Sequence, residues 1–244
     1  MGAVKGYWFQ VQEEERERWI REHLDDEDAD EETERWDELA NEYDMMLEAQ
    51  EFEAEYQWFK KQCYSALHDI FINEIDKLKE LFDTQVAIQH EQTIYKMIYA
   101  HSVTLLESFL SDTVKSLIIR KTEYFENAIR NVEDLKKSKF NLSEISTQTN
   151  GAVGLAVKTL STILYHNIPK VSQILNSIVG CKLSLEIDRM GYITSVRHDI
   201  VHRNGRTTEG ALIDIDKDTV KQAITDIEEF VDKLQIKLNE LENV

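Results

Sequence analysis

The fold of this chain is decided by residues 218–241, whose sequence is DTVKQAITDIEEFVDKLQIKLNEL. Apolar residues recur in it at steps of three and four over three heptads: Val220, Ile224, Ile227, Val231, Leu234, Leu238 and Leu241. This spacing places one apolar stripe along a single α-helix. The stripe predicts a long helix that packs inside a helical bundle, which is the commoner arrangement, or zips against a second subunit.

The same helical periodicity extends over most of the chain. One proline and eight glycines in 244 residues leave little room for many-turned β architectures, so we expect an all-α protein. Residues 34–82 contain neither proline nor glycine and predict one long helix or two nearly collinear ones. The other expected helices span residues 11–24, 93–120, 124–135, 141–166, 169–180 and 185–203, with a loop or short hairpin at 206–215.

Charge divides the chain unevenly. Residues 1–60 contain 21 acidic and 6 basic residues, a balance of −15 out of the net −19. The acidic run at 25–32 is expected to repel itself and extend. We therefore predict an acidic helical extension over residues 1–84, suited to meet an inhibitory or regulatory partner, followed by a nearly neutral helical domain over residues 85–244.

Cysteine usage and hydropathy indicate the compartment. Cys63 and Cys181 lie far apart and form no Cys-x-x-Cys motif, which favours a reducing cytosol over a disulfide scaffold or zinc site. No apolar run approaches a membrane span, and no charged-then-apolar leader opens the sequence. The expectation is a cytoplasmic protein without a membrane contact, metal or cofactor.

Reactive side chains concentrate in residues 197–205, whose sequence is RHDIVHRNG. Arginine keeps its charge in proteins, whereas histidine titrates near neutrality, so Arg197 and His202 together could hold a phosphate and move a proton. Arg197, Arg203 and Arg206 outweigh Asp199 in charge, which favours local RNA binding.

The spacing of Arg197 and His202, with four residues between them, resembles the Arg-x(4–6)-His motif of the HEPN superfamily. The arrangement of polar residues around the pair looks like the prokaryotic defence-associated branch, and residues 99–110 are similar to an earlier helix of that branch. The resemblance covers about residues 93–241. It implies an all-helical, HEPN-like bundle and a metal-independent ribonuclease in which two subunits bring their motifs together.

The resemblance implies a role for each motif residue. Arg197 would hold the phosphate bidentately and His202 would act as base or acid. Glu107 would orient Arg197 or His202; otherwise it is a helix-face acid in water. Asn204 stands where some family toxins carry a tyrosine that a partner enzyme adenylylates, so that form of silencing is not expected here.

Other interpretations of these residues remain open at this point. His198, Asp199 and Asn204 are supporting candidates, although Asn204 with Gly205 also reads as a helix C-cap. His198 and His202 have the spacing of a two-histidine metal clamp but lack the glutamate of His-Glu-x-x-His. The non-catalytic interpretation of the whole motif is a solvated helix end, at which basic residues interact favourably with the negative end of the helix dipole.

The predicted function is a homodimeric endoribonuclease that leaves a 2′,3′-cyclic phosphate, as a toxin of a toxin–antitoxin pair or an antiviral defence effector. A rival from another class is a catalytically silent HEPN-like module for dimerisation or nucleotide binding. A second rival is a structural adaptor built on the long N-terminal helix.

Overall fold

The computed structural model describes residues 2–84, 87–148 and 150–242 and divides the chain into two compact units, residues 1–57 and 58–244. Within the described residues the regular secondary structure is helical, apart from one isolated antiparallel bridge between Arg206 and Leu212. The all-α prediction is therefore confirmed. Nowhere in the described ranges does a helix have the length and apolar composition needed to cross a membrane.

The first unit is built on α1 (Gly2–Leu24) and the larger part of α2 (Trp36–Lys61). Its core is a small cluster of buried residues, against which Trp19 and Leu24 pack: Ile20, Ala29, Trp36, Leu39 and Ala40. Arg16 forms an ion pair with Asp44 at 3.2 Å, which also joins the two helices. Helix α1 begins nine residues earlier than the helix expected over 11–24.

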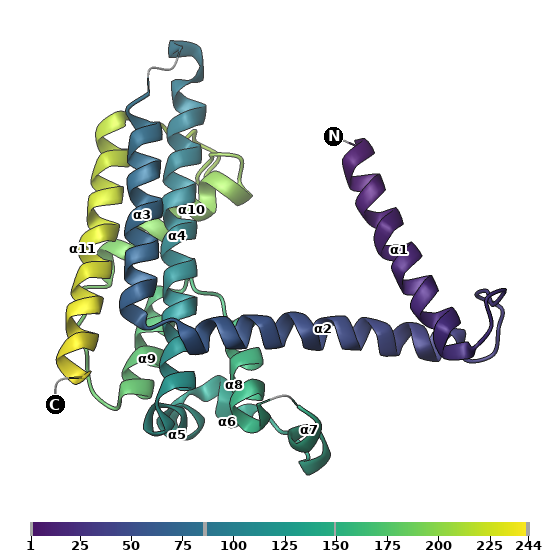
Figure 1. Cartoon of the computed structure of the whole chain (residues 1–244). Helices are drawn as coiled ribbons and strands as arrows, with labels where there is room; N and C mark the ends of the chain where they lie inside the picture. The colour runs from purple at the N-terminus through teal and green to yellow at the C-terminus, as the bar shows by residue number, and fades with distance from the viewer. Residues whose placement is uncertain (1, 85–86, 149, 243–244) are drawn as a thin grey trace. The chain divides into compact units, whose positions relative to one another are not determined.

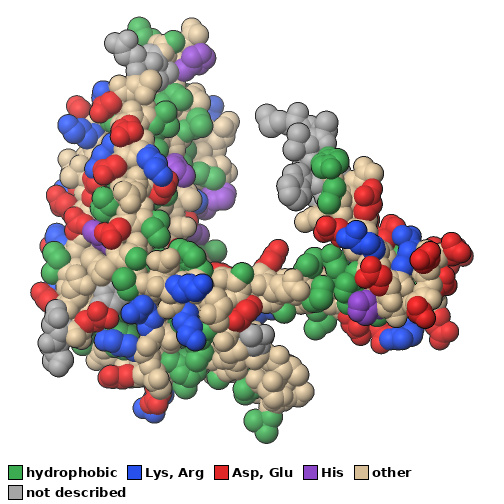
Figure 2. Space-filling view, in the orientation of Figure 1, with side chains coloured by type: hydrophobic (Ala, Val, Ile, Leu, Met, Phe, Trp, Pro, Cys, Tyr) green, Lys and Arg blue, Asp and Glu red, His purple; other side chains and the backbone are tan. Residues whose placement is uncertain are grey.

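The acidic run between α1 and α2 is folded, which corrects the expectation that it would extend. Ala29 is buried, and its carbonyl accepts a hydrogen bond of 2.9 Å from Arg21 Nε. Asp26 and Asp30 accept hydrogen bonds from the backbone N–H groups two residues later. These local bonds fix the loop despite the charge repulsion, because the carboxylates satisfy backbone donors instead of facing one another. Red acidic side chains crowd this part of the chain in Figure 2.

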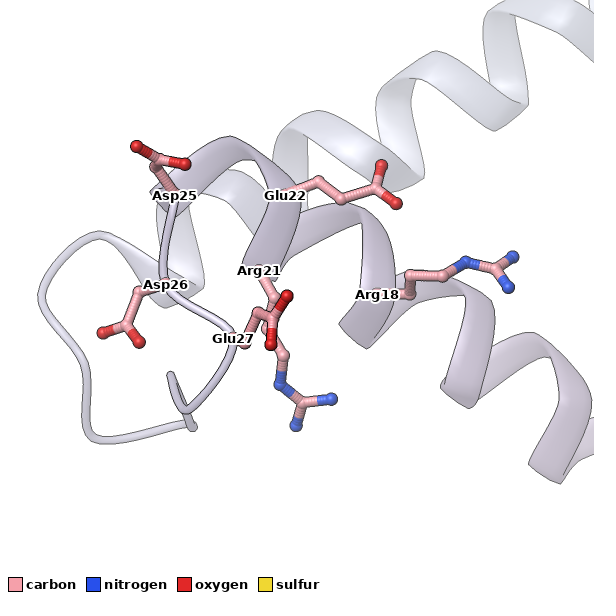
Figure 3. Close-up of a pocket in the computed structure, with 6 residues that line it drawn as sticks. All are labelled: Arg18, Arg21, Glu22, Asp25, Asp26 and Glu27. Carbon is pink, nitrogen blue, oxygen red and sulfur yellow. The ribbon is translucent and has the colours of Figure 1, made fainter.

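The end of α1 and the acidic loop line a surface hollow (Figure 3). Its lining mixes two arginines with four carboxylates: Arg18, Arg21, Glu22, Asp25, Asp26 and Glu27. The labelled side chains of Arg18 and Asp25 point away from one another, and Arg21 lies beside Glu27. The arginines are thus placed among acids, and the hollow offers no uniform charge to a ligand.

The second unit has three long helices at its centre (Figure 1): α3 (Tyr64–Phe82), α4 (Glu91–Arg120) and α11 (Lys217–Glu242) pack against one another. The stripe residues of α11 from Val220 to Leu238 are buried, and Leu241 is half-buried. The stripe therefore packs within the unit. Because α3 belongs to this packing, the expected extension of residues 1–84 is shared between both units.

Shorter helices complete the second unit. Their bounds are η1 Ile88–His90, α5 Thr122–Asn131, α6 Glu133–Lys137, α7 Leu142–Thr147, α8 Gly151–Ser161, α9 Ile168–Val179 and α10 Asp188–His202. Pro169 lies in the first turn of α9, and Gly180 ends that helix with φ +76°, as their positions in the sequence predict.

Local backbone geometry divides the helical pattern at two places, and the first division is one of the two alternatives that the sequence left open for residues 34–82. The pattern over 34–82 breaks after Lys61, and Cys63 caps α3 by accepting a bond from Ala66 N–H at 3.4 Å. The expected helix over 141–166 divides into α7 and α8, because Asn150 and Gly151 take left-handed φ values of +67° and +55°. Helix α8 ends at Ser161, which leaves His166 in the loop before α9.

Candidate active site

The candidate site lies where α10 packs on α4. Met190, Ile193 and Thr194 form the buried face of α10, and Arg197 continues this face one turn further. The sequence therefore directs the motif arginine toward α4. Glu107 lies on α4 in the same contact, where an acid is costly unless it is paired.

Arg197 and Glu107 form an ion pair. Arg197 Nη2 lies 3.6 Å from Glu107 Oε2, and the two side chains are 17% and 19% exposed. The other oxygen, Glu107 Oε1, lies 3.9 Å from His166 Nδ1. Glu107 thus joins the motif helix to the loop before α9. This arrangement agrees with the hypothesis that Glu107 orients Arg197, and not with a solvated helix-face acid.

Two buried polar atoms of this cluster carry no hydrogen bond among the described residues: Arg197 Nε and Glu107 Oε1. A buried donor without a partner costs free energy, and charged groups cost the most. The cluster is therefore held by charge attraction more than by saturated hydrogen bonding.

The loop that carries His166 is fixed by its neighbour Tyr165. Tyr165 is buried, and its hydroxyl donates a hydrogen bond of 3.1 Å to the carbonyl of Leu160. Burial raises the pKa of the Tyr165 phenol far above its ordinary value, so the group stays neutral. Nothing in the sequence pattern connects His166 with Glu107, 59 positions earlier (166 − 107), because the connection depends on where α8 ends.

His202 faces solvent beside His198. The two imidazole rings lie 4.7 Å apart between centroids, and both side chains are exposed. Their four-residue spacing places them on one face of α10, away from the face that carries Arg197. Within one chain, then, Arg197 is held inward by Glu107 while His202 is presented outward.

The chain after His202 turns sharply, as the Asn204-Gly205 pair predicts. Asn204 and Gly205 have φ values of +52° and +71°, and the Gly205 N–H donates to the carbonyls of Asp199 and Ile200 at 3.1 and 3.2 Å. Such bonds close the orphan carbonyls at a helix end. Asn204 is exposed and acts here through its backbone as the left-handed residue of the C-cap.

The exposed arginines of the motif have partners within the chain. Arg203 is ion-paired with Asp199 one turn earlier, and Arg206 donates a hydrogen bond of 3.0 Å to the carbonyl of Gly210. Residues 206–212 form the short hairpin that the sequence allowed, with Thr207 N–H donating to the Ala211 carbonyl at 2.9 Å. Contact with RNA would require both arginines to share or exchange these partners.

A basic residue that the sequence interpretation did not single out lies at the end of the motif. A Cβ atom at Gly205 would stand 3.0 Å from Lys96 Nζ, so the ammonium group of Lys96 lies against this glycine. Lys96 precedes Glu107 by 11 residues, which is three helical turns and the same face of α4. That spacing is the one sequence signal that could have found it.

In the described part of the chain, His198 and His202 have no third side chain beside them that could complete a metal site. There, no group of three or more histidine, cysteine, aspartate or glutamate side chains is close enough to hold one ion. His198 and His202 are adjacent, while His166 is engaged with Glu107.

Comparison with known proteins agrees with this architecture. A family model described as RiboL-PSP-HEPN matches residues 69–240, which is more than half of the chain. The chain therefore belongs to this family, and so to the HEPN superfamily. The membership indicates an RNA-related, nuclease-type function at the level of the family. The same comparisons match no curated protein and no solved structure.

Proposed function

We propose that the chain is a metal-independent endoribonuclease that cleaves RNA through Arg197 and His202. The observation that carries this proposal is the held position of Arg197. Glu107 fixes the guanidinium at the α4–α10 contact, while His202 stands exposed five residues later on the same helix. Phosphoryl transfer from RNA requires at least a positioned cation and an accessible titratable group, and α10 carries both.

The reaction uses the nucleophile that RNA already carries. The 2′-hydroxyl loses its proton to a base and attacks phosphorus, the bond to the 5′-oxygen breaks, and an acid returns a proton to that oxygen. The products are a 2′,3′-cyclic phosphate and a free 5′-hydroxyl. His202 supplies one of the two proton transfers, and Arg197 stabilises the charge that develops on the phosphate oxygens.

A homodimer would supply the second proton transfer. One His202 cannot easily be both base and acid in the same step, so a second copy of the chain would contribute its own His202. An exposed aromatic side chain on α10 supports a protein contact there: Tyr192 is 70% exposed. A facing α10 helix would cover it.

A ribonuclease in a living cell must be restrained, so a toxin or antiphage-defence effector is the context that we propose. The acidic first unit is the element suited to regulation, through an inhibitory or regulatory partner with a basic surface.

The direct test is incubation of the purified protein with tRNA and mRNA in excess EDTA. We expect the natural protein to cleave the RNA and the His202→Ala variant to leave it intact. His90→Ala is a matched control, because His90 is exposed at the start of α4 and lies outside the motif. Cleavage that requires a divalent ion, or that survives His202→Ala, would contradict the proposal. A dimer that cleaves no RNA would favour the silent regulatory module.

A further inference from the structure

Hydrogen bonds hold in place the surface against which Lys96 lies. One turn before it on α4, the side-chain amide of Gln92 donates to the Ile215 carbonyl at 2.9 Å and accepts from the Ile215 N–H at 3.3 Å. These bonds fix the segment after the motif helix against α4. The Ile213 N–H also donates to the Gly205 carbonyl at 2.8 Å, which fixes Gly205 itself. The surface beneath the lysine therefore has a defined position.

Gly205 leaves the space that the Lys96 side chain occupies. Its φ of +71° strains any residue with a side chain, and a Cβ atom there would stand 3.0 Å from the ammonium nitrogen and 3.6 Å from Lys96 Cε. The glycine is thus required for two reasons: it forms the turn at the end of α10, and it leaves room for the Lys96 side chain. Replacement of Gly205 would disturb both, so the lysine is the better position to test.

The ammonium group of Lys96 has no polar partner among the described residues. Its side chain is half-buried, yet among the residues that the structure describes it makes no hydrogen bond or ion pair. By contrast, Arg197, Arg203 and Arg206 each have a partner within the chain. A half-buried ammonium group without an acceptor favours contact with an anion, because binding offsets the cost of its partial desolvation.

The position of Lys96 relative to Glu107 decides which anion it can meet. Their separation of eleven positions (107 − 96) corresponds to about 17 Å along the axis of α4. This separation places Lys96 and the Glu107-held Arg197 at different points along the helix. A polyanion with regularly spaced phosphates can contact both, if it runs across α10 and past His202.

We propose that Lys96 binds a backbone phosphate of the RNA strand, at a position flanking the phosphate that is cleaved. This inference rests on the proposed ribonuclease function and deepens it. Lys96 holds the strand in register while Arg197 and His202 act on the scissile phosphate. The contact is to the phosphate backbone, so it carries no base preference.

The test compares Lys96→Gln with Lys139→Gln, which removes the same charge from an exposed position between α6 and α7, at the opposite end of the unit from η1 and the start of α4 (Figure 1). Binding is measured with a mixed-sequence oligoribonucleotide that is 2′-O-methylated at every sugar, so that no cleavage occurs. For Lys96→Gln we expect about fivefold weaker binding at physiological salt. The dependence of log K on log salt should become shallower by about 0.7, the loss of one single-strand phosphate contact. Lys139→Gln should change neither quantity.

Cleavage of the unmodified RNA separates this inference from the function on which it rests. Lys96→Gln should raise KM and leave kcat within about twofold, since the lysine contributes binding and not chemistry. An unchanged salt slope, or a fall in kcat with unchanged binding, would overturn the role of Lys96 while the ribonuclease function stands. If the natural protein neither binds nor cleaves RNA, both the role of Lys96 and the ribonuclease function are overturned. A purely structural lysine would lower thermal stability without altering the salt slope.

Discussion

Glu107 on α4 and Arg197 on α10 form an ion pair of 3.6 Å between two side chains that are each more than four-fifths buried. The residues are 90 positions apart in sequence (197 − 107), and their contact fixes the motif helix on the central helix of the bundle. Removal of one partner would leave the other charge partly buried and unpaired, which is more costly than the net value of the pair.

Substitution of Glu107 should therefore affect stability and activity together. We expect Glu107→Gln to lower the free energy of unfolding by about 1–3 kcal/mol and to reduce RNA cleavage, because the guanidinium of Arg197 loses the carboxylate that positions it. Denaturant unfolding and cleavage assays measure the two effects. Glu229→Gln, at an exposed position on α11, is the control and should change neither. Additive effects of Glu107→Gln and Arg197→Met in a double-mutant cycle would show that the pair is not coupled.

The start of α11 should confer pH-dependent stability. Asp216 accepts a hydrogen bond of 2.7 Å from the Thr219 N–H, and bonds from the Thr219 hydroxyl and backbone hold the pKa of Asp216 below its ordinary value. A lowered pKa stabilises the fold above the unfolded pKa, and this stabilisation is lost as pH falls through the folded pKa. We expect Asp216→Ala to lower Tm at neutral pH, with a gap that closes in acid. A gap that stays constant with pH would contradict this assignment, whereas Asp216→Asn should preserve most of the cap at all pH values.

The helices were predictable to the extent that they follow side-chain periodicity and caps. The stripe of α11, Pro169 at the start of α9 and the Asn204-Gly205 turn are local signals that the structure retains. The division before Cys63 was left open as one of two alternatives, because a cysteine cap is a weak signal. The division at Asn150 was not predicted, because a single glycine, Gly151, is tolerated within a helical pattern.

The site was predictable only in its local part. Arg197, His198, Asp199 and His202 lie in one nonapeptide, so their order along α10 follows from helical spacing. The contacts of Glu107 with Arg197 and His166, and of Lys96 with Gly205, join segments tens of residues apart. Those contacts depend on how α4, α10 and the loop before α9 pack, which periodicity does not encode. The roles of the motif residues in catalysis stay predictions.

Assembly should determine activity if each subunit contributes one histidine. We expect a dimer at micromolar concentration by analytical ultracentrifugation, with α10 of each subunit in the contact. In a mixed dimer of His202→Ala and natural subunits, activity should fall by much more than half, because neither composite site holds two imidazoles. A monomer that remains fully active would contradict this prediction.

The acidic first unit should restrain access to the motif if it shields the basic residues there. Deletion of residues 1–57 removes that unit with its own core and is expected to raise RNA affinity and cellular toxicity. Added salt should partly mimic the deletion, since exposed charge contacts are screened beyond about 8 Å at physiological ionic strength. Salt also weakens RNA binding itself, so both forms are compared at each salt level. Equal cleavage rates across the series would assign the unit to partner docking or solubility.

The central claim, that Arg197 and His202 cleave RNA by activating its 2′-hydroxyl, is tested most directly by the ends of the products. An end-labelled RNA is incubated in EDTA with the natural protein, Arg197→Ala and His202→Ala, and the products are resolved by mass spectrometry. We predict a 2′,3′-cyclic phosphate and a 5′-hydroxyl from the natural protein, and intact RNA from both variants, whose helical circular dichroism stays unchanged. A 5′-phosphate product, or cleavage that survives both substitutions, would contradict the claim.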